Sequence, residues 1–371
     1  MSGKQKKIIK LKSKIKDTIN FKDKNVSVVN AIRRTILQDI PVVVFKNIHI
    51  TKNTTVFNNE ILKQRLACIP IHIKDLDLDN LKNLKLIINM KNHEDNVLNL
   101  TTEDFQIQLV EQKKMLSKDD LKKIFPPNSI TKSYILFVRL NPHVSNEIPS
   151  EELELTADFG ISTARQNGAY NVVSACSYGL TVDPVKVEEN WEKYEDYLKK
   201  KGMIEKDIAY EKINWMNHDK YKRENCIENS YDLLIESIGI YRIEELLKKS
   251  CEIIKMKLSS IKKIAESKSL KIIPEKIALE HSFDIFLENE GYTIGKLIEY
   301  SLHENYFNKE KILSYVGFMK YHPHDEHCVI RVAFTKYIAN NKKSNEDNVN
   351  VLIANACEKL LKIYKDIAES F

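Results

Sequence analysis

Cysteine is scarce in this chain, and its spacing argues against a common class of metal site. The six cysteines lie far apart, at positions 68, 176, 226, 251, 328 and 357. No two of them form the Cys-x-x-Cys pair from which many structural zinc sites are built. Their scatter is typical of reduced, mostly buried thiols in an intracellular protein. We therefore expect no resident metal and no other cofactor.

Long apolar runs are also missing. No stretch of 18 apolar residues occurs, and the first residues, MSGKQKKIIKLKSKIK, contain no apolar core of a signal peptide. The sequence thus predicts a protein that is neither secreted nor membrane-spanning. The lysines of this first segment fit two interpretations, a nuclear localisation signal or a polar segment that precedes a first strand.

Arginine is rare among the basic residues. Of the 58 lysines and arginines only eight are arginine, against 52 acidic residues, and the formal net charge is +6. This mild excess falls short of a dedicated nucleic-acid-binding surface. The lysine bias, beside abundant Ile and Asn, indicates an AT-rich coding sequence. Where arginine does occur, we expect a site that needs its fork-shaped donor, which lysine cannot replace.

What is present is enough for a globular protein of two to three domains. The chain has 371 residues, of which 43% are hydrophobic and 30% charged. Apolar residues recur at helical spacing over 26–40, and Pro41 ends that helix. The alternating segment VVVFKNIHI predicts a strand over 42–50, and NEILKQRLA predicts a helix over 59–67 that ends before Pro70.

A β-rich block follows from about residue 71. Short apolar runs separated by turn residues predict strands over 84–90, 105–110, 134–140 and 152–159. The charged and aromatic segment 186–225 allows no assignment. A strand is predicted over 231–238, then a helix over 242–265. One stripe of that helix carries Ile243, Leu247, Cys251, Ile254, Leu258 and Ile261, a seam that requires a partner helix.

The rest of the chain has the pattern of a second small module. It predicts a strand over 282–290, a helix over 295–307, a hairpin of 313–321 and 327–334, and a last helix over 347–368. The apolar face of the last helix is predicted to carry Ile353, Leu360, Ile363 and Ile367. The predicted fold class is α+β. The predicted domains are a first dimerisation domain (14–50 with 226–265), an inserted β-rich domain (51–225), a linker (266–280) and a second dimerisation domain (281–371).

The segment 20–73 carries a family resemblance. Asn30 to Pro41 has the pattern N-x-h-R-R-x-h-h-x-x-h-P (h, apolar), an Asn-Thr-Thr-Val turn follows at 53–56, and Arg65 to Pro70 reads R-L-x-x-I-P. In these motifs and their spacing the chain resembles the RNA polymerase alpha-like family. That family includes the bacterial alpha N-terminal domain, the third-largest subunit of polymerase II and its archaeal counterpart. Residues 152–170 and 231–261 resemble its later strands and its long helix.

The second module resembles the small partner in the same system, which is the eleventh-largest subunit of polymerase II and its archaeal counterpart. The matching segments are ENEGYTIGKLI (288–298, with Tyr292 where the family usually has His), YVGFMKYHPHDEHCVIRV (315–332) and Asn355 to Cys357. In those families the two proteins form a heterodimer. The resemblance implies that both partners are joined here as an intramolecular pseudo-dimer, as in large DNA viruses. The implied location is a cytoplasmic viral factory and the virion, with the nucleus as the alternative.

The resemblance also implies function, partners and sites. The function is a non-catalytic scaffold that nucleates assembly of the two catalytic subunits of a DNA-directed RNA polymerase. The partners are the second-largest and largest subunits and small polymerase subunits, with DNA reached only through the complex and no membrane. Arg33, Arg34 and Arg65 are the implied partner-binding residues. The implied dimerisation core is Val29, Ile32, Ile36, Leu247, Ile254, Leu258, Leu297, Ile353 and Leu360. Some relatives hold zinc or an iron–sulfur cluster in the inserted domain, but residues 71–175 contain no cysteine.

Three short motifs resemble functional sites but lack essential parts of them. Asp158-Phe159-Gly160 matches a kinase triplet, but neither a glycine-rich phosphate loop nor the kinase catalytic-loop motif occurs. Asp75, Asp77 and Asp79 lack the glycine and glutamate that a calcium loop needs. The turn histidines 322, 324 and 327 fit a solvated turn better than a metal site. The alternative functions are a free-standing DNA-binding transcription factor, for which no recognition helix is visible, and an enzyme acting alone.

Overall fold

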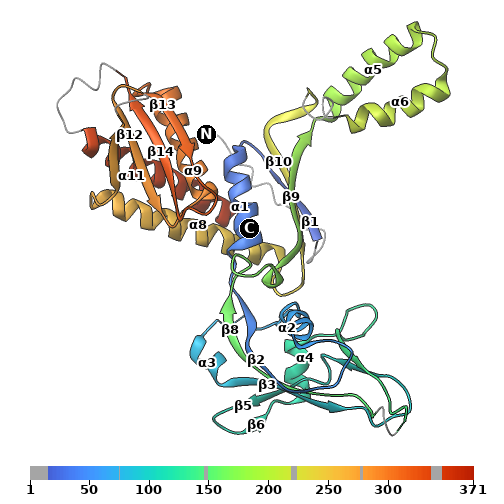
Figure 1. Ribbon diagram of the computed structural model, residues 1–371. Coiled ribbons are helices and arrows are strands. Elements are labelled where there is room, and N and C mark those ends of the chain that lie inside the picture. Colours follow the sequence, from blue (N-terminus) through green and yellow to red (C-terminus); the bar gives the residue numbers. More distant parts are fainter. Residues whose placement is uncertain (1–15, 75, 146–148, 219–223, 276–278, 336–344) are drawn as a thin grey trace. The chain divides into compact units, whose positions relative to one another are not determined.

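The chain is an α+β protein, as the pattern predicts. The computed structural model describes residues 16–74, 76–145, 149–218, 224–275, 279–335 and 345–371 (Figure 1). Its contacts divide it into two compact units. Unit 1 contains residues 1–36, 175–236 and 243–371, and unit 2 contains residues 37–174 and 237–242.

The first part of unit 1 is a three-stranded sheet with one helix. The strand order is β1-β10-β9, with bounds Lys16–Phe21, Cys226–Ser237 and Val173–Val182, and the helix is α1 (Val26–Gln38). Strands β1 and β10 are antiparallel, and the register places Ile19 opposite Leu233, both fully buried. Helix α1 buries Val29, Ile32 and Ile36, which recur at intervals of about one helical turn, and the adjacent Val28.

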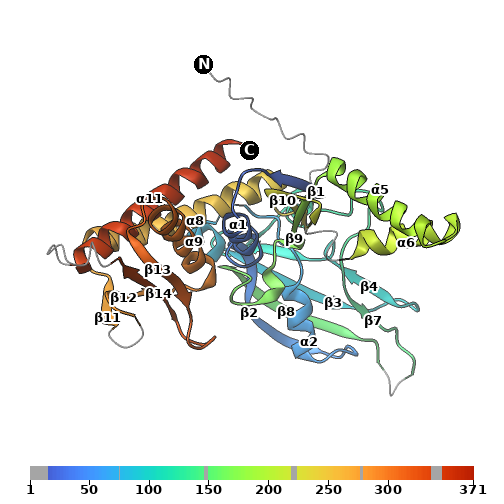
Figure 2. The same ribbon diagram turned by 90° about the horizontal axis from the view of Figure 1, so that it is seen from above.

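The second part of unit 1 is a four-stranded antiparallel sheet with helices on one side of it (Figures 1 and 2). The strand order is β11-β12-β14-β13, with bounds Lys271–Glu275, Ser282–Glu288, His327–Phe334 and Leu313–Met319. The helices are α8 (Ile243–Glu266), α9 (Tyr292–Leu302), which a π-helical turn η2 (His303–Lys309) extends, and α11 (Asn345–Glu369). Gly295 of α9 packs so closely on the sheet that a Cβ there would clash with the Phe318 ring.

A helical hairpin occupies the segment for which the sequence allowed no assignment. It consists of α5 (Pro184–Lys200) and α6 (Glu205–Asn217). Asp183 caps α5 by accepting from two backbone N–H groups, and Pro184 occupies the first turn, where a missing N–H costs nothing. The two helices meet around Trp191, Leu198 and Ile208. The hairpin therefore has a small core of its own.

Unit 2 contains the β-rich block. One sheet has the order β2-β8-β3-β5-β6, with bounds Val42–Asn53, Glu152–Ser162, Leu84–Lys91, Gln106–Leu109 and Lys114–Met115. A second, two-stranded sheet pairs β4 (Leu98–Thr101) with β7 (Leu136–Leu140). The helical elements are α2 (Asn59–Ala67), α3 (Leu78–Lys82), α4 (Lys118–Ile124) and the 3₁₀ turn η1 (Gly168–Tyr170). Aromatic rings of Phe45, Phe105, Phe125, Phe137 and Phe159 join the core of this unit.

The Asn-Thr-Thr-Val turn has a local explanation. The Asn53 side chain accepts from the backbone N–H and the hydroxyl of Thr55, and it donates to the Phe57 carbonyl, so one amide organises the turn. Asn58 then caps α2 by accepting from Ile61 N. These bonds fix where the strand ends and where the helix begins.

Three features of the chain differ from the sequence prediction. The segment 266–280, predicted as a linker, contains β11, which pairs with β12 and so belongs to the second sheet. The inserted domain, predicted over 51–225, corresponds to unit 2, which already begins at Leu37, because β2 pairs with β8. It gives way to unit 1 after Ser174, because β9 hydrogen-bonds to β10. On α11 the buried side chain is Tyr364 rather than Ile363, which is half-buried. Ile363 lies about 100° around the helix from Tyr364.

Candidate functional site

Helices α8 and α11 form an antiparallel pair in unit 1. From Leu247 to Ala265, one stripe of buried residues of α8 follows at alternating intervals of four and three, which is the spacing of a coiled-coil seam. Ion pairs flank it: Lys262 lies 3.3 Å from Glu358, and Lys268 lies 2.7 Å from Asp347. We call the facing buried residues of the two helices the seam. They are Leu247, Cys251, Ile254, Leu258, Ile261 and Ala265 of α8, and Val349, Ile353, Ala356, Cys357, Leu360, Tyr364 and Ile367 of α11.

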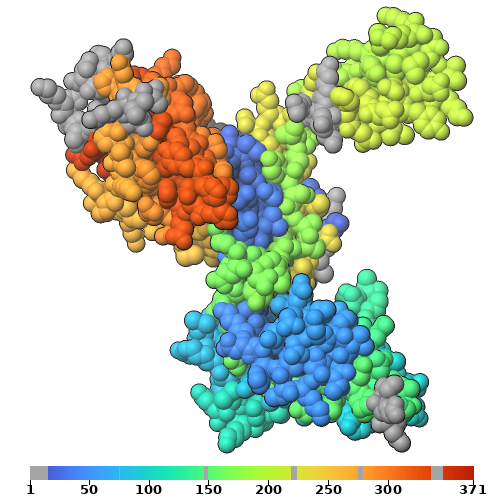
Figure 3. Space-filling model, in the orientation of Figure 1, coloured from blue at the N-terminus to red at the C-terminus, as the bar shows by residue number. Residues whose placement is uncertain are grey.

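Helices α1 and α9 close the same core. The Tyr364 hydroxyl of α11 donates to the Val28 carbonyl of α1 at 3.2 Å, and burial raises the pKa of this tyrosine well above its usual value. Ser301 of α9 donates to the Ala356 carbonyl of α11 at 3.2 Å. Figure 3 shows α1, in blue, in contact with the orange residues of the second module. The second module is thus joined to the first by buried polar contacts as well as by apolar packing.

Every residue predicted for the dimerisation core is buried in unit 1. Each is at most 1% exposed, and they come from α1, α8, α9 and α11: Val29, Ile32, Ile36, Leu247, Ile254, Leu258, Leu297, Ile353 and Leu360. The structure therefore brings these residues into the interior. Whether they mediate assembly stays a prediction.

Two of the three arginines predicted to bind a partner donate to groups on other elements of the chain. Arg34 Nε donates to Thr293 Oγ1 at 2.9 Å and so connects α1 with α9. Arg65 Nε donates to the Phe137 carbonyl at 2.8 Å and Nη2 to the Leu136 carbonyl at 3.2 Å. Arg33 donates only within its own helix, from Nε to Asn30 Oδ1 at 2.9 Å. Among the three, Arg33 is therefore the one that contacts no other element through a hydrogen bond between described residues.

Burial makes most of the thiols unreactive. It raises the pKa of Cys176, Cys251, Cys328 and Cys357 to about 12 in each case. A thiol with such a pKa is protonated at neutral pH, whereas nucleophiles and metal ligands are thiolates. These four side chains act as small apolar residues, and two of them, Cys251 and Cys357, belong to the seam.

A hollow of about 400 Å³ opens in unit 2 between the 53–57 turn, α2 and β7. Its lining residues are Val56, Phe57, Arg65, Leu136, Val138, Arg139 and Asn141. The Arg65 guanidinium lies over the Phe57 ring, 5.3 Å from its centre, and forms one wall. Arg139 projects from β7 and is exposed. The residues predicted from the sequence do not include Arg139, although the rarity of arginine in this chain is a signal that would have found it.

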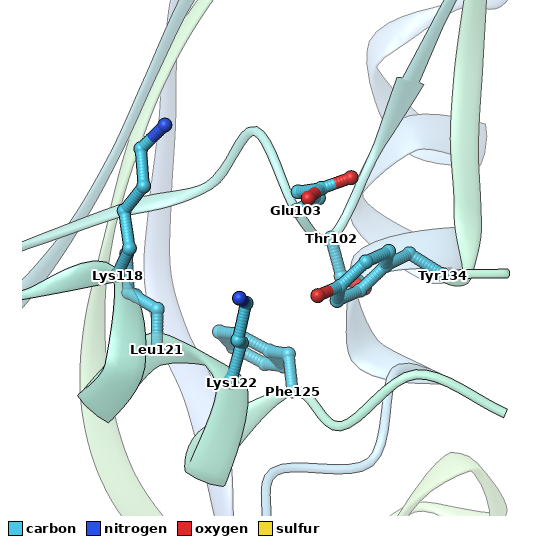
Figure 4. Close-up of a pocket in the computed structure, with 7 residues that line it drawn as sticks. All are labelled: Thr102, Glu103, Lys118, Leu121, Lys122, Phe125 and Tyr134. Carbon is cyan, nitrogen blue, oxygen red and sulfur yellow. The ribbon is translucent and has the colours of Figure 1, made fainter. Parts of the chain in front are cut away.

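A second, much smaller cavity lies against α4, with a volume of about 20 Å³ (Figure 4). The hydroxyl of Tyr134 and the side chain of Lys122 point toward it in this view. The Thr102 side chain also lines it, and within the described part of the chain its buried hydroxyl has no hydrogen-bond partner. The volume suits one water molecule, which would satisfy that hydroxyl.

The three short motifs that resemble functional sites have structural roles. Asp158 to Gly160 lie inside β8 and pair with β2. Asp77 caps α3, and Asp79 pairs with Lys82, while Asp75 lies outside the described residues. The His322 and His324 rings stack, with centroids 5.0 Å apart. Within the described ranges no three His, Cys, Asp or Glu side chains gather as a metal site. Nor does any described helix have the length and apolar character to cross a membrane.

Comparison with known proteins gives the family. A search of curated proteins found no match. The family model of the RNA polymerase Rpb3/Rpb11 dimerisation domain matches residues 18–258, more than half of the chain, and this span contains α1, the whole of unit 2 and most of α8. The chain therefore belongs to the RNA polymerase Rpb3/Rpb11 dimerisation domain family, whose members are non-catalytic polymerase subunits that associate with other polymerase subunits.

Proposed function

We propose that this chain is an assembly subunit in which both partners of the dimerisation are joined. The first partner comprises α1, the three-stranded sheet and α8, and the second comprises residues from β11 to the end of α11. The observation that carries the proposal is the seam. Most of α8 lies in the family-matched span, and one stripe of this helix is buried against α11, which lies outside that span.

Several contacts support a shared core rather than two adjacent domains. Adjacent domains of one chain meet through modest and rather polar interfaces. Here Leu258 and Leu360 are fully buried, and the Tyr364–Val28 and Ser301–Ala356 hydrogen bonds lie inside the core. Burying such groups without partners costs about 1–3 kcal/mol each, so their pairing favours one arrangement of the two modules.

Such a subunit would present its two dimerisation partners, already paired within one chain, to the two catalytic subunits. Its partners under this proposal are the second-largest and largest subunits of a DNA-directed RNA polymerase and its small subunits. Arg33 is the candidate contact to the second-largest subunit, because its guanidinium keeps donors that its own helix does not use. Arg34 is a poorer candidate, since it bonds to Thr293.

Copurification is the decisive experiment. The chain is tagged in its native source, purified at moderate salt, and its partners are identified and quantified by mass spectrometry. Large polymerase subunits in a one-to-one ratio support the proposal. Purification with DNA but without those subunits supports the alternative, a free-standing transcription factor. Arg33→Glu tests the contact, with exposed Lys362→Ala as the surface control.

We further propose a large DNA virus as the source. The joined arrangement and the lysine-rich composition support this proposal. Transcription would then take place in a cytoplasmic factory and the subunit would be packaged in the virion. Quantitative mass spectrometry of purified particles tests this, because packaging requires the chain and the large subunits in equal amounts.

A further inference from the structure

The hollow beside Arg65 has an apolar lining and two arginines. Val56 stands at its edge with 77% of its surface exposed. The half-buried Phe57 and Leu136 add further apolar surface, and Val138, which is almost fully buried, completes the lining. None of the seven lining residues is acidic. The nearby Glu151 carboxylate already accepts two hydrogen bonds, from the backbone and side-chain nitrogens of Asn141.

Arg65 and Arg139 differ in what their donors do. Arg65 uses Nε and Nη2 for the carbonyls of Phe137 and Leu136, so it holds α2 against β7. Arg139 lies on β7 opposite Asn99, and no hydrogen bond or ion pair with another described residue engages its guanidinium. Its donors are therefore available at the mouth of the hollow.

The choice of arginine at position 139 is itself informative. In a chain with 50 lysines and eight arginines, an exposed cation is ordinarily lysine. Each other described arginine has a hydrogen-bond or ion-pair partner within the chain; for example, Arg165 bonds to Asp39 and Arg331 to Asp284. For Arg33 this partner is Asn30 of its own helix. Among the described arginines, Arg139 is the one whose guanidinium has no such partner. A planar guanidinium that has no acceptor within the chain is suited to bidentate pairing with a carboxylate of another molecule.

We propose that the hollow binds a polypeptide segment of another polymerase subunit, in which an acidic side chain stands next to a bulky apolar one. The carboxylate pairs with Arg139, and the apolar side chain fills the space between Val56, Phe57 and Leu136. A volume of about 400 Å³ is at the small end of ligand pockets and suits one large side chain. Nucleic acid fits less well, because phosphate recognition needs several free cations along a surface. That the segment comes from a polymerase subunit rests on the proposed function.

The first test is photo-crosslinking in the assembled complex. The photoreactive residue p-benzoylphenylalanine replaces Val56 in the full chain, and the same residue at exposed Lys113 serves as the control position. We expect a crosslink from position 56 to a peptide of another subunit with Asp or Glu beside a large apolar residue. Adding Arg139→Ala should reduce its yield about tenfold or more. A yield no higher than from position 113, or one unaffected by Arg139→Ala, overturns the proposal.

The second test uses the chain alone and defined probes. The peptide acetyl-Gly-Phe-Glu-Phe-Gly-amide, its Gln counterpart and a twelve-nucleotide oligothymidylate are titrated by nuclear magnetic resonance. We expect saturable shifts at residues 56–57 and 136–139 with the Glu peptide. The Gln peptide and the Arg139→Ala variant should each bind about tenfold or more weakly, Arg139→Lys several-fold more weakly, and Lys114→Ala normally. Preference for the oligonucleotide, or equal binding of the Glu and Gln peptides, overturns the proposal.

The two tests separate this site from the function on which it rests. If the large subunits copurify but position 56 crosslinks to nothing, the site is wrong and the assembly role stands. If no polymerase subunit copurifies while the Glu peptide binds in an Arg139-dependent way, the hollow is a peptide site and the polymerase role is wrong. Unfolding midpoints of the Arg139 variants within a degree or two of the parent show that the binding loss is not a folding loss.

Discussion

Cutting the chain between Lys268 and Ser269 tests the shared core directly. The cut falls after α8 and before β11, so each fragment keeps all strands of its own sheets. Residues 267–269 are exposed, which makes them accessible to an inserted protease site. We expect the fragments 1–268 and 269–371 to remain associated, because the seam and the Tyr364–Val28 bond join them without the covalent connection.

The expected magnitude follows from Leu360, which is fully buried in the seam. Replacing a buried leucine with alanine costs about 2–5 kcal/mol. If that cost falls on association, it weakens the fragment complex about 30-fold to several thousand-fold at ~1.4 kcal/mol per factor of ten. Leu360→Asp adds the cost of burying a carboxylate and should prevent association. Lys362→Ala is the matched control on the same helix, since 72% of its side chain is exposed and such changes stay within about 0.5 kcal/mol.

The assay combines size-exclusion chromatography with light scattering after cleavage, and fluorescence anisotropy on labelled fragment 269–371 for the dissociation constant. Co-elution of the parent fragments, graded loss with Leu360→Ala and full loss with Leu360→Asp are expected. If the parent fragments elute apart while both stay folded by circular dichroism, the modules are independent and the shared core is wrong. Equal effects of Leu360→Ala and Lys362→Ala would place the interface elsewhere.

Four further predictions concern individual residues or residue pairs. A double-mutant cycle of Arg34→Ala and Thr293→Val, followed by urea unfolding, should give a coupling of about 0.5–1.5 kcal/mol, and additivity would argue against the bond. Burial, with Lys74 nearby, lowers the pKa of His72, so the folded state binds this proton less readily than the unfolded state. Stability should therefore decline as the pH falls below about 6.5, and His72→Gln should flatten that decline in pH-dependent thermal melts. Lys268 has a φ of 56°, so Lys268→Pro should lower Tm by calorimetry whereas Lys268→Gly should not. Iodoacetamide at pH 8 should label exposed Cys68 first by peptide mass spectrometry. The thiols expected to react only after unfolding are Cys176, Cys251, Cys328 and Cys357.

The regular elements could be predicted wherever one signal dominated. Helix α1 and strand β2 follow from the apolar period and from Pro41 between them, and α2 has the predicted bounds 59–67. The long helices α8 and α11 were visible because their apolar stripes run for several turns. In such segments burial and local preference favour the same structure, so the sequence alone is sufficient.

Other elements depend on contacts that no local pattern shows. In the α5–α6 hairpin 14 of the 30 helical residues are charged, and only three buried side chains mark its inner face. Strand β11 is five residues long, contains Pro274, and owes its pairing to β12, which begins seven residues after it ends. From the sequence, either Ile363 or Tyr364 could be the buried residue of α11, because either fits an apolar stripe. Tyr364 is the buried one, since its hydroxyl donates to the Val28 carbonyl.

In the candidate site, too, some residues could be predicted from a local pattern and others depend on contacts between distant segments. The core residues were predictable because burial is an average property of a stripe. The arginines were not, because the partner of a guanidinium depends on which elements meet: Arg34 meets Thr293 more than 250 residues away, and Arg65 meets two carbonyls of β7. Arg139 could have been noticed from composition alone. Its free donors and the adjoining hollow are visible only in three dimensions.

In the joined arrangement that we propose, the connection does more than hold two partners near each other. Helix α8 ends at Glu266 and β11 begins at Lys271, so the residues between them span at most about 15 Å when extended. The turn at Lys268 shortens that reach, and the Lys268–Asp347 ion pair lies beside it. Two separate chains lose roughly 4–15 kcal/mol of translational and rotational freedom on pairing, and a short connection removes most of this cost. The seam can therefore include weakly packing residues such as Cys251, Ala265 and Cys357. Joining also fixes the ratio of the two partners at one to one before any catalytic subunit binds.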